Sequence, residues 1–342
     1  MALVVLTSSS QATAAGPAPA GVAAQAGEEG RSSKRVWILA LSVTSSAVWL
    51  AVIGTQALSG AHELLRAVIG AQSQMIGPAL IVVVVAVFLA ERRWPAVRRP
   101  ALARAHIVDA GYLLLFAVVG PFVTLLNTGF AVVIERHAHF LMLRRLPLVP
   151  QVVVAALIIV GIDGMNWVAH VANHRSAPLW RFHALHHSQE EMSVFTTFRT
   201  HPLAHASYLP ALIPALVLGA SGTVPGTALI VYGCLVTIPH ANLRWTFGPL
   251  GRILVSPAYH RLHHANSPVE GQATVNFGFV LVVWDRLAGR AVHPSGAEPV
   301  ATGIAGRPVP IEQNVSPSRI ARVVAAQLVQ PLRARAAMDG RP

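Results

Sequence analysis

The histidines of this chain are concentrated between His170 and His264, where they recur at short, fixed spacings. In order they read H-x-x-x-H (His170, His174), H-x-x-H-H (His183, His186, His187), H-P-x-x-H (His201, His205), a single His240, and a second H-x-x-H-H (His260, His263, His264). Residues three or four apart lie on one face of a helix, so each cluster can direct its rings toward one point. Neutral imidazole is also the commonest protein ligand of iron, copper and zinc. The pattern therefore predicts a metal centre built from histidine.

The number and type of these candidate ligands indicate which metal they bind. The pair and the two triplets offer eight imidazoles, which is more than a single zinc ion needs. No histidine pair brackets a glutamate in the H-E-x-x-H manner of zinc hydrolases. The single Cys234 excludes a cysteine-ligated zinc or iron–sulfur site. Because zinc cannot change its oxidation state, an all-nitrogen shell for two metals favours iron and the activation of oxygen.

Other histidines leave alternatives open. His240 ends an apolar run, and it could be a ligand or a structural residue. The same alternatives apply to His201 and His205, where Pro202 predicts the start of a helix. No role is expected for the histidines outside any pattern, which are His62, His106, His137, His139 and His293.

Two aspartates lie close to the clusters in the sequence. Asp163 precedes His170 by seven residues, which places it two helical turns away on the same face. A carboxylate inside an apolar run is a functional candidate, so Asp163 could orient a histidine or form a hydrogen bond between packed helices. Asp285 stands beside Arg286, and it could support a histidine or pair with that arginine.

The composition is that of a membrane protein. The chain is 54% hydrophobic and 12% charged, whereas soluble proteins carry about 25% charged residues. The net charge of +12 comes mostly from arginines in short loops beside apolar runs, which fits the positive-inside rule better than a nucleic-acid surface.

The apolar segments predict an all-α bundle of about four to six membrane spans with a histidine-rich cytoplasmic cap. The expected spans are residues 36–61, 67–90, 107–134 and 150–168, followed by two short spans within 206–239. Arginines in residues 91–106 and basic residues before the first span place both the N-terminus and that loop in the cytoplasm. The third span is expected to kink at Pro121, and a re-entrant hairpin is an alternative there.

Three regions are expected along the chain. Residues 1–34, which are rich in alanine, glycine, serine and proline, predict a disordered tail. Residues 35–293 predict the membrane-embedded catalytic domain, and residues 294–342 predict a basic extension. Within that extension, apolar residues recur at helical spacing over 316–330. This segment predicts an amphipathic helix that lies either on the protein surface or on the membrane surface.

The histidine clusters and the residues around them resemble the fatty acid hydroxylase superfamily, also called the sterol desaturase family. The segment DGMNWVAHVANH (163–174) is similar to the family's opening block, and LWRFHALHHSQEEMSVFTTFRTHP (179–202) is similar to its central block. HRLHHA (260–265), followed by NFGFVLVVWDRLAGR (276–290), is similar to its closing block. The similarity covers about residues 75 to 293.

The resemblance implies a diiron, O2-dependent oxidoreductase that hydroxylates or desaturates a lipid, which could be a sterol, a fatty acyl chain or another isoprenoid or ether lipid. The implied iron ligands are His170, His174, His183, His186, His187, His240, His260, His263 and His264. Catalytic roles beside these ligands are expected for Asp163, Asn276 and Asp285. The chain departs from the usual family residues at Val171, Ser193, His205 and Ala265, which leaves the ligands intact and the substrate open.

A separate electron donor is expected, because the sequence shows no flavin or nicotinamide motif. A ferredoxin or a cytochrome with its reductase would serve, and an acidic donor would suit the arginine-rich cytoplasmic face. The expected location is a membrane of the bacterial inner-membrane type, with no nucleic-acid partner. A membrane transporter or metal carrier is the alternative, but it would need metal acceptors along a crossing path. A haem b cytochrome would need paired histidines within the spans.

The expected topology places both termini and every histidine cluster on the cytoplasmic side. Reporter fusions after residues 100, 190 and 270 should therefore all give a cytoplasmic signal. A periplasmic signal after residue 190 or 270 would put the clusters on opposite sides of the bilayer and contradict a single metal centre.

Overall fold

The computed structural model describes residues 77–100, 103–143, 149–218, 224–266, 275–295, 299–304 and 319–333. All of them belong to one compact unit, Gly60–Pro342. The expected N-terminal tail and the expected first span lie outside the described residues.

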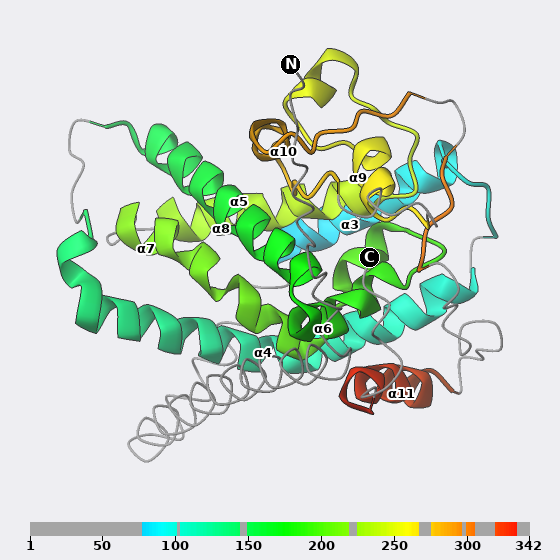
Figure 1. The fold of residues 1–342 in the computed structure, drawn as a ribbon, viewed down its shortest axis with the longest axis horizontal. Helices are drawn as coiled ribbons and strands as arrows, with labels where there is room; N and C mark the ends of the chain where they lie inside the picture. The colour runs from blue at the N-terminus through cyan, green and yellow to red at the C-terminus, as the bar shows by residue number, and fades with distance from the viewer. Residues whose placement is uncertain are drawn as a thin grey trace, which may run out of the picture. The chain divides into compact units, whose positions relative to one another are not determined.

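The described part of the chain is built from helices (Figure 1). In chain order they are α3 (Pro78–Arg93), α4 (Arg104–Ala138), η1 (His139–Leu141), α5 (Gln151–Arg175), α6 (Ala177–His187), η2 (Val194–Phe198), η3 (Pro202–Leu212), α7 (Ile213–Leu218), α8 (Val224–Thr237), η4 (Ile238–His240), η5 (Gly248–Arg252), α9 (Pro257–His263), α10 (Val283–Leu287) and α11 (Ile320–Arg333). Extended pairing among these residues is limited to isolated bridges. The expected all-α class is confirmed for the described residues.

One described helix, α5, is by itself long and apolar enough to cross a membrane. The long helix α4 adds a second candidate if its two parts, His106–Gly120 and Phe122–Leu141, are taken as one span bent by 44°. This bend falls at Pro121, where a kink is expected because proline removes a helical hydrogen bond. Shorter apolar helices cover Pro202–Leu218 and Pro225–His240, where two short spans are expected. The count of four to six spans and the cytoplasmic side of the cap stay predictions.

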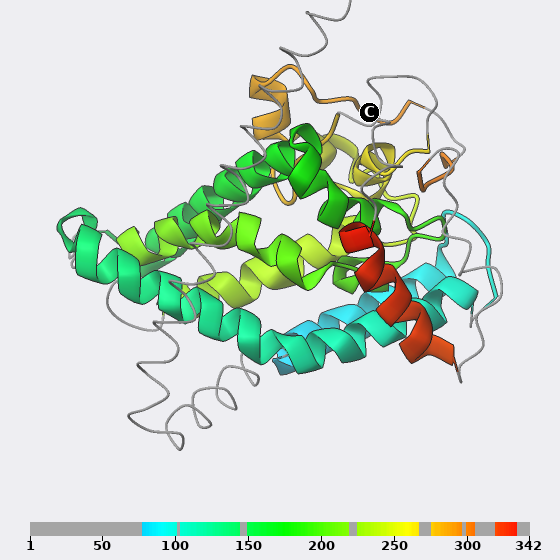
Figure 2. The same cartoon turned by 60° about the horizontal axis from the view of Figure 1, so that its bottom comes forward.

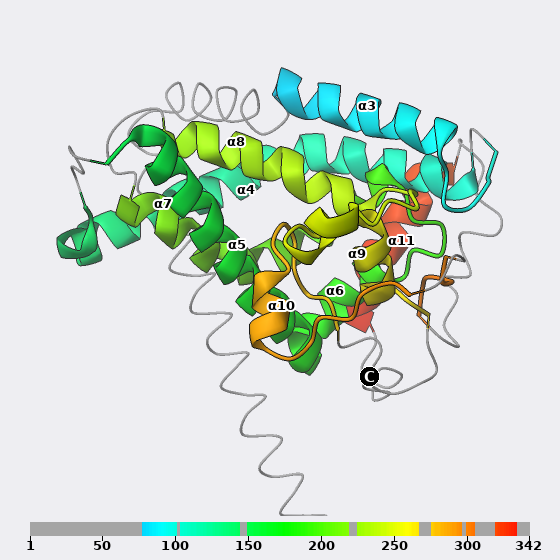
Figure 3. The same ribbon diagram turned by 90° about the horizontal axis from the view of Figure 1, so that it is seen from above.

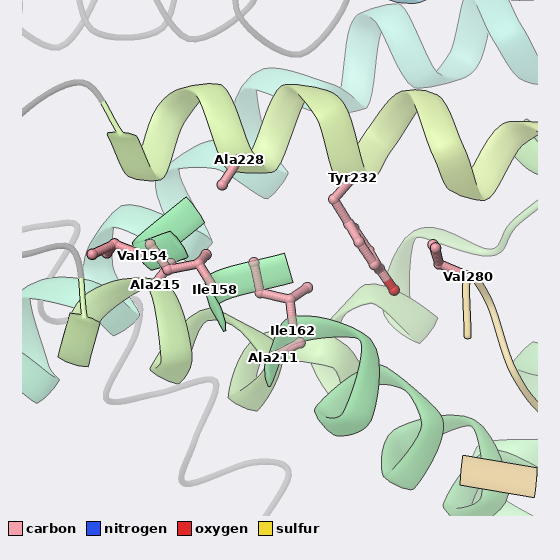
Figure 4. Close-up of a cluster of buried hydrophobic side chains, with 8 residues drawn as sticks. All are labelled: Val154, Ile158, Ile162, Ala211, Ala215, Ala228, Tyr232 and Val280. Carbon is pink, nitrogen blue, oxygen red and sulfur yellow. The ribbon is translucent and has the colours of Figure 1, made fainter. Parts of the chain in front are cut away.

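The helices that carry the site are held by a core around α5 (Figure 4). Ile158 and Ile162 of α5 are buried against small residues, among them Ala215 of α7 and Ala228 of α8. Small side chains at these contacts allow the helix backbones to approach closely. At Gly161, an added Cβ would lie 2.7 Å from the ring of Pro214, so this contact requires glycine.

The histidine-bearing segments meet because the chain turns sharply at the end of α5. Ser176 ends α5 and begins α6, and Pro178 stands in the first turn of the new helix, where its missing N–H is not needed. Farther along, α9 begins where the Ser256 hydroxyl accepts a hydrogen bond from the Tyr259 amide, with Pro257 in its first turn. Figure 3 shows α6, α9 and α10 gathered at one side of the long helices.

The C-terminal helix α11 packs on protein, which favours the surface-helix interpretation over a helix on the membrane surface. Figure 2 shows α11 lying across α4. Its apolar residues Val323 and Val324 are buried against Val108 of α4 and Leu185 of α6. Gln327 is also buried, and its side-chain oxygen accepts a hydrogen bond from the Tyr112 hydroxyl at 2.8 Å. The periodicity predicts the apolar face of this helix correctly, and the structure shows what covers it.

Replacing Val324 by aspartate should detach α11, because it would bury an unpaired carboxylate between α11 and α4. We expect a loss of several kcal/mol of stability, on the order known for buried unpaired charges, and rapid proteolysis of the C-terminal segment. The matched control is Ala325→Asp on the exposed face of the same helix turn. Equal thermal unfolding and equal proteolysis of the two variants would show that α11 is not held by this face.

Candidate metal centre

The structure brings all nine implied ligand histidines together at one place in the fold. They form two groups, in each of which one ring nitrogen per histidine lies within 4.8 Å of the others. The first group is His170, His174, His183, His187 and His263, and the second is His186, His240, His260 and His264. All nine side chains are buried. Each group therefore has enough nitrogen atoms to hold one metal ion.

Each H-x-x-H-H triplet contributes to both groups. On α6, His183 and His187 join the first group while His186 between them joins the second. On α9 the assignment is reversed, since His260 and its neighbour His264 join the second group and His263 joins the first. Histidines four residues apart lie on one side of the helix, whereas the two adjacent histidines of each triplet point about 100° apart around the helix axis and so face different groups. Each triplet therefore supplies histidines to both groups, and the two groups lie next to each other.

Hydrogen bonds to carbonyl groups fix the tautomers of two rings in the first group. His170 Nδ1 lies 2.8 Å from the Phe277 carbonyl oxygen, and His263 Nδ1 lies 2.8 Å from that of Val275. A carbonyl only accepts, so each Nδ1 carries the proton and each Nε2 carries a lone pair. These two Nε2 atoms lie 3.0 Å apart. Two lone pairs at this distance repel, and a cation between them removes the conflict.

The charge state of these rings agrees with this interpretation. Burial lowers the pKa of His263 to about 3 and that of His186 to about 4, so both rings are neutral near pH 7. A protonated imidazolium is therefore not available to bridge the facing nitrogens. Neutral imidazole is the form that coordinates metals.

The second group contains ring nitrogens without a partner among the described residues. His264 lacks a hydrogen-bond partner at both nitrogens, and His186 and His260 lack one at Nδ1. Leaving a buried polar atom unpaired costs about 1–3 kcal/mol. The Nε2 atoms of His186 and His240 lie 3.1 Å apart, as do those of His240 and His260. Nitrogen atoms this close together could be ligands of one ion. Both groups therefore fit a metal ion.

Asp285 positions the first group through the backbone. Its carboxylate accepts hydrogen bonds from the amides of Phe277 (2.9 Å) and Gly278 (2.8 Å), and from the side chains of Trp167 (2.8 Å) and Tyr259 (3.0 Å). The Phe277 carbonyl then holds the His170 ring. No hydrogen bond joins Asp285 to a histidine, and no ion pair joins it to Arg286, among the described residues. Asp285 thus reaches the histidines only through the backbone, and the roles expected for it from the sequence stay predictions.

Asp163 anchors residues 280–281, which follow the two residues held by Asp285. It accepts hydrogen bonds from the amides of Val280 (3.0 Å) and Leu281 (3.0 Å), from Trp284 Nε1 (2.9 Å) and from the Tyr232 hydroxyl (3.1 Å). No hydrogen bond to a histidine is present in the described part of the chain, so the helix-packing interpretation applies and direct orientation of a histidine does not.

Asn276, which precedes these residues, connects them to α9 by a hydrogen bond. Its side-chain amide donates to the carbonyls of Tyr259 (3.0 Å) and Val292 (2.8 Å), and its oxygen accepts from the Val292 amide (2.7 Å). The residue has a φ of 60°, a left-handed conformation that asparagine tolerates better than most residues. These contacts are structural ones, and the catalytic role expected for Asn276 stays a prediction.

Two further buried polar groups hold the site, and neither is expected from the sequence motifs. Glu91 of α3 accepts hydrogen bonds from the amides of Val194 and Asn242, both at 2.7 Å, next to the turn that carries His240. Arg199 pairs with Asp109 at 3.4 Å, and its guanidinium also donates to the Leu185 carbonyl within the α6 triplet. A charged residue at the edge of an apolar run is the only sequence signal for either group.

The remaining candidate histidines lie outside both groups. His201 begins η3, accepts a hydrogen bond from the Leu203 amide at Nδ1, and lies 3.0 Å from the Leu328 carbonyl of α11 at Nε2. His205 packs against Phe116 of α4. Both rings therefore have structural contacts.

Comparisons with known proteins place this site in a family. The family described as "Fatty acid hydroxylase" matches residues 155–290, which contain all nine histidines. An ornithine lipid hydroxylase of Rhizobium tropici is 30% identical over 232 residues, covering 67% of this chain and 64% of that protein. These matches confirm the resemblance that the motifs indicate. No solved structure matches the chain significantly.

Alkylglycerol monooxygenases share the same region. The Caenorhabditis elegans protein is 28% identical over 129 residues, covering 36% of this chain and 24% of its own length. The human protein is 28% identical over 134 residues, covering 38% of this chain and 28% of its own length. The chain thus spans less than two thirds of the length of each of these relatives.

Replacing Asp285 by alanine should weaken metal binding although the residue contacts no histidine. Four donors would lose their acceptor, and the Phe277 carbonyl would no longer be held against His170. We expect iron affinity to fall about 10- to 100-fold, as is found when groups that orient metal ligands are removed. Asp285→Asn retains one acceptor oxygen and should lie between the two, while the neighbouring Arg286→Gln should match the wild type. Unchanged iron affinity in Asp285→Ala would contradict the positioning role.

Proposed function

Because the chain contains a fatty acid hydroxylase domain, we propose that it is a membrane-bound, O2-dependent hydroxylase of a lipid that uses two iron ions. The observation that carries the proposal is the pair of buried histidine groups, in which the Nε2 lone pairs of His170 and His263 face each other and both ring nitrogens of His264 lack a partner among the described residues. The first ion would be held by His170, His174, His183, His187 and His263. The second would be held by His186, His240, His260 and His264.

Two irons at this position would supply the activation of O2 needed to oxidise an unactivated C–H bond. The side chains of the chain itself keep this region dry and rigid. Trp180 packs on the rings of His174 and His187 with centroids 5.0 and 5.4 Å away, and Phe277 packs on His174 and His263 at 5.1 and 5.3 Å. Apolar walls exclude water, which protects a reactive oxidant from side reactions.

The substrate is proposed to be a lipid with a polar headgroup and an alkyl chain. Support comes from the names of the relatives, which act on ornithine lipid and on alkylglycerol. Both names denote insertion of oxygen, so we favour hydroxylation over desaturation. The location of the site at the end of α5, an apolar helix long enough to span a membrane, would allow an acyl or alkyl chain to reach it from the bilayer.

Two electrons per O2 are proposed to come from a separate ferredoxin, or from a cytochrome with its reductase. The exposed Arg92 in the last turn of α3 and Arg98 after it would attract an acidic donor. The metal-carrier alternative is less well supported, because the two histidine groups form one compact site instead of a series of sites along a helix.

Iron content and activity test the proposal together. Protein expressed with iron and purified in lipid should contain close to two irons per chain and hydroxylate lipid when a donor and its reductase are added. His186→Ala and His263→Ala each remove a nitrogen from a different group. Each should lower the iron content and abolish lipid oxidation, while His293→Ala should behave as wild type. Full activity of a preparation with one iron or none would contradict the two-iron site.

A further inference from the structure

A patch of exposed apolar residues lies on the cap, outside the metal centre. It comprises Trp94, Trp245, Leu250, Ile253, Val283 and Leu287, and we refer to it as the interfacial patch. Leu287 is 77% exposed, Leu250 59% and Ile253 58%, so these are among the most exposed large apolar side chains of the cap. An exposed apolar cluster of this kind marks a surface that binds another molecule or a membrane.

Two parts of the patch are each held together by a hydrogen bond or a ring contact. The Ile253 carbonyl accepts a hydrogen bond from the Val282 amide at 2.8 Å, which ties the end of η5 to the start of α10. On the other side, the rings of Trp94 and Trp245 have centroids 6.1 Å apart. All patch residues except Trp94 lie on segments that flank α9 in the sequence, and α9 with its C-cap residue His264 contributes three histidines to the centre.

The α10 part of the patch is attached to α5. The Trp284 ring of α10 lies against Gly164, where an added Cβ would be 3.0 Å from the ring, and its Nε1 donates to Asp163. Gly164 and Asp163 both belong to α5, the helix that is long and apolar enough to span a membrane. Leu287 follows Trp284 on the same short helix, so this part of the patch is fixed to a helix that can cross a membrane. This position favours lipid over a soluble partner.

Charge around the patch has one sign. Arg93, Arg244, Arg252 and Arg286 are exposed, and the Arg93 guanidinium lies 5.4 Å from the centre of the Trp94 ring. Among described residues 91–100, 241–266 and 275–295, the only acidic side chains are Glu91 and Asp285, and both are buried with hydrogen-bond partners. Tryptophan beside arginine is typical of the level of the lipid headgroups.

We propose that the interfacial patch seats the cap on an anionic membrane surface, with its apolar side chains among the acyl chains and its arginines at the lipid phosphates. This inference rests on the proposed function only in assuming that the chain is embedded in a membrane. Seating the patch would hold α9 and its histidines at the level of the headgroups, where a lipid chain can enter the site.

A probe at the patch tests its environment in the full-length protein. The single native cysteine is first replaced, Cys234→Ala, and Leu250→Cys or Leu287→Cys is then labelled with an environment-sensitive fluorophore in vesicles of neutral lipid with or without anionic lipid. Ala325→Cys, on the exposed face of α11, is the matched control. We expect the patch probes to be quenched by bromine on the acyl chains and shielded several-fold from aqueous iodide relative to the control.

The arginines are tested with the same probes. In mixed vesicles, quenching by brominated anionic lipid is divided by quenching by brominated neutral lipid. This ratio should fall about fivefold for Arg252→Gln and for Arg286→Gln, because each change removes one cation from an anionic surface. Arg322→Gln on α11 is the control. Iodide quenching equal to that of the Ala325→Cys probe, or an unchanged lipid ratio in both arginine variants, would overturn the proposal.

Shielding of the probes that requires an added acidic ferredoxin would also overturn the proposal, since the patch would then bind a protein. Iron content and lipid hydroxylation are measured on the same preparations. A water-exposed patch in protein that holds two irons and is active would refute the membrane seat alone. A lipid-shielded patch in protein without iron would refute the proposed function alone.

Discussion

The fold of the cap depends on bringing nine neutral imidazoles together in a buried space where they cannot satisfy one another. His170 and His263 have their protons held on Nδ1 by backbone carbonyls, so their Nε2 lone pairs face each other at 3.0 Å. Burial keeps the rings uncharged, as the lowered pKa of His263 indicates. Cations at the two centres would turn this arrangement from a repulsive one into a stabilising one, because metal binding and folding are coupled.

The chain supports this arrangement with backbone segments fixed by buried carboxylates. Asp163 and Asp285 each accept two backbone amides from residues 277–281 and two side-chain donors from neighbouring helices. Glu91 does the same for the turns at Val194 and Asn242. A carboxylate that accepts several hydrogen bonds can remain in an apolar interior. The same hydrogen bonds fix the backbone of the loop that donates them. The histidines are therefore held by carbonyl groups and helices whose positions are fixed by these hydrogen bonds.

Much of the site follows from the sequence, and the rest depends on tertiary packing. The spacing of His183, His186 and His187 predicts a helical face of ligands, and the family motifs predict which other histidines join them. The division of each triplet between the two groups does not follow, since it depends on how α6 and α9 face each other. The partners of Asp163 also do not follow, because two of its donors are backbone amides of a segment far along the chain. For α11, periodicity defines an apolar face but does not distinguish a membrane from α4 as its cover.

The central claim is that cations satisfy the facing imidazoles, and the most direct test is the thermal unfolding midpoint of one preparation before and after a chelator removes its metal. The account predicts a large fall in the midpoint and recovery with ferrous ion. It predicts no recovery with magnesium, which prefers oxygen ligands. An unchanged midpoint in fully metal-free protein would show that the histidines are satisfied without cations, and it would contradict the account.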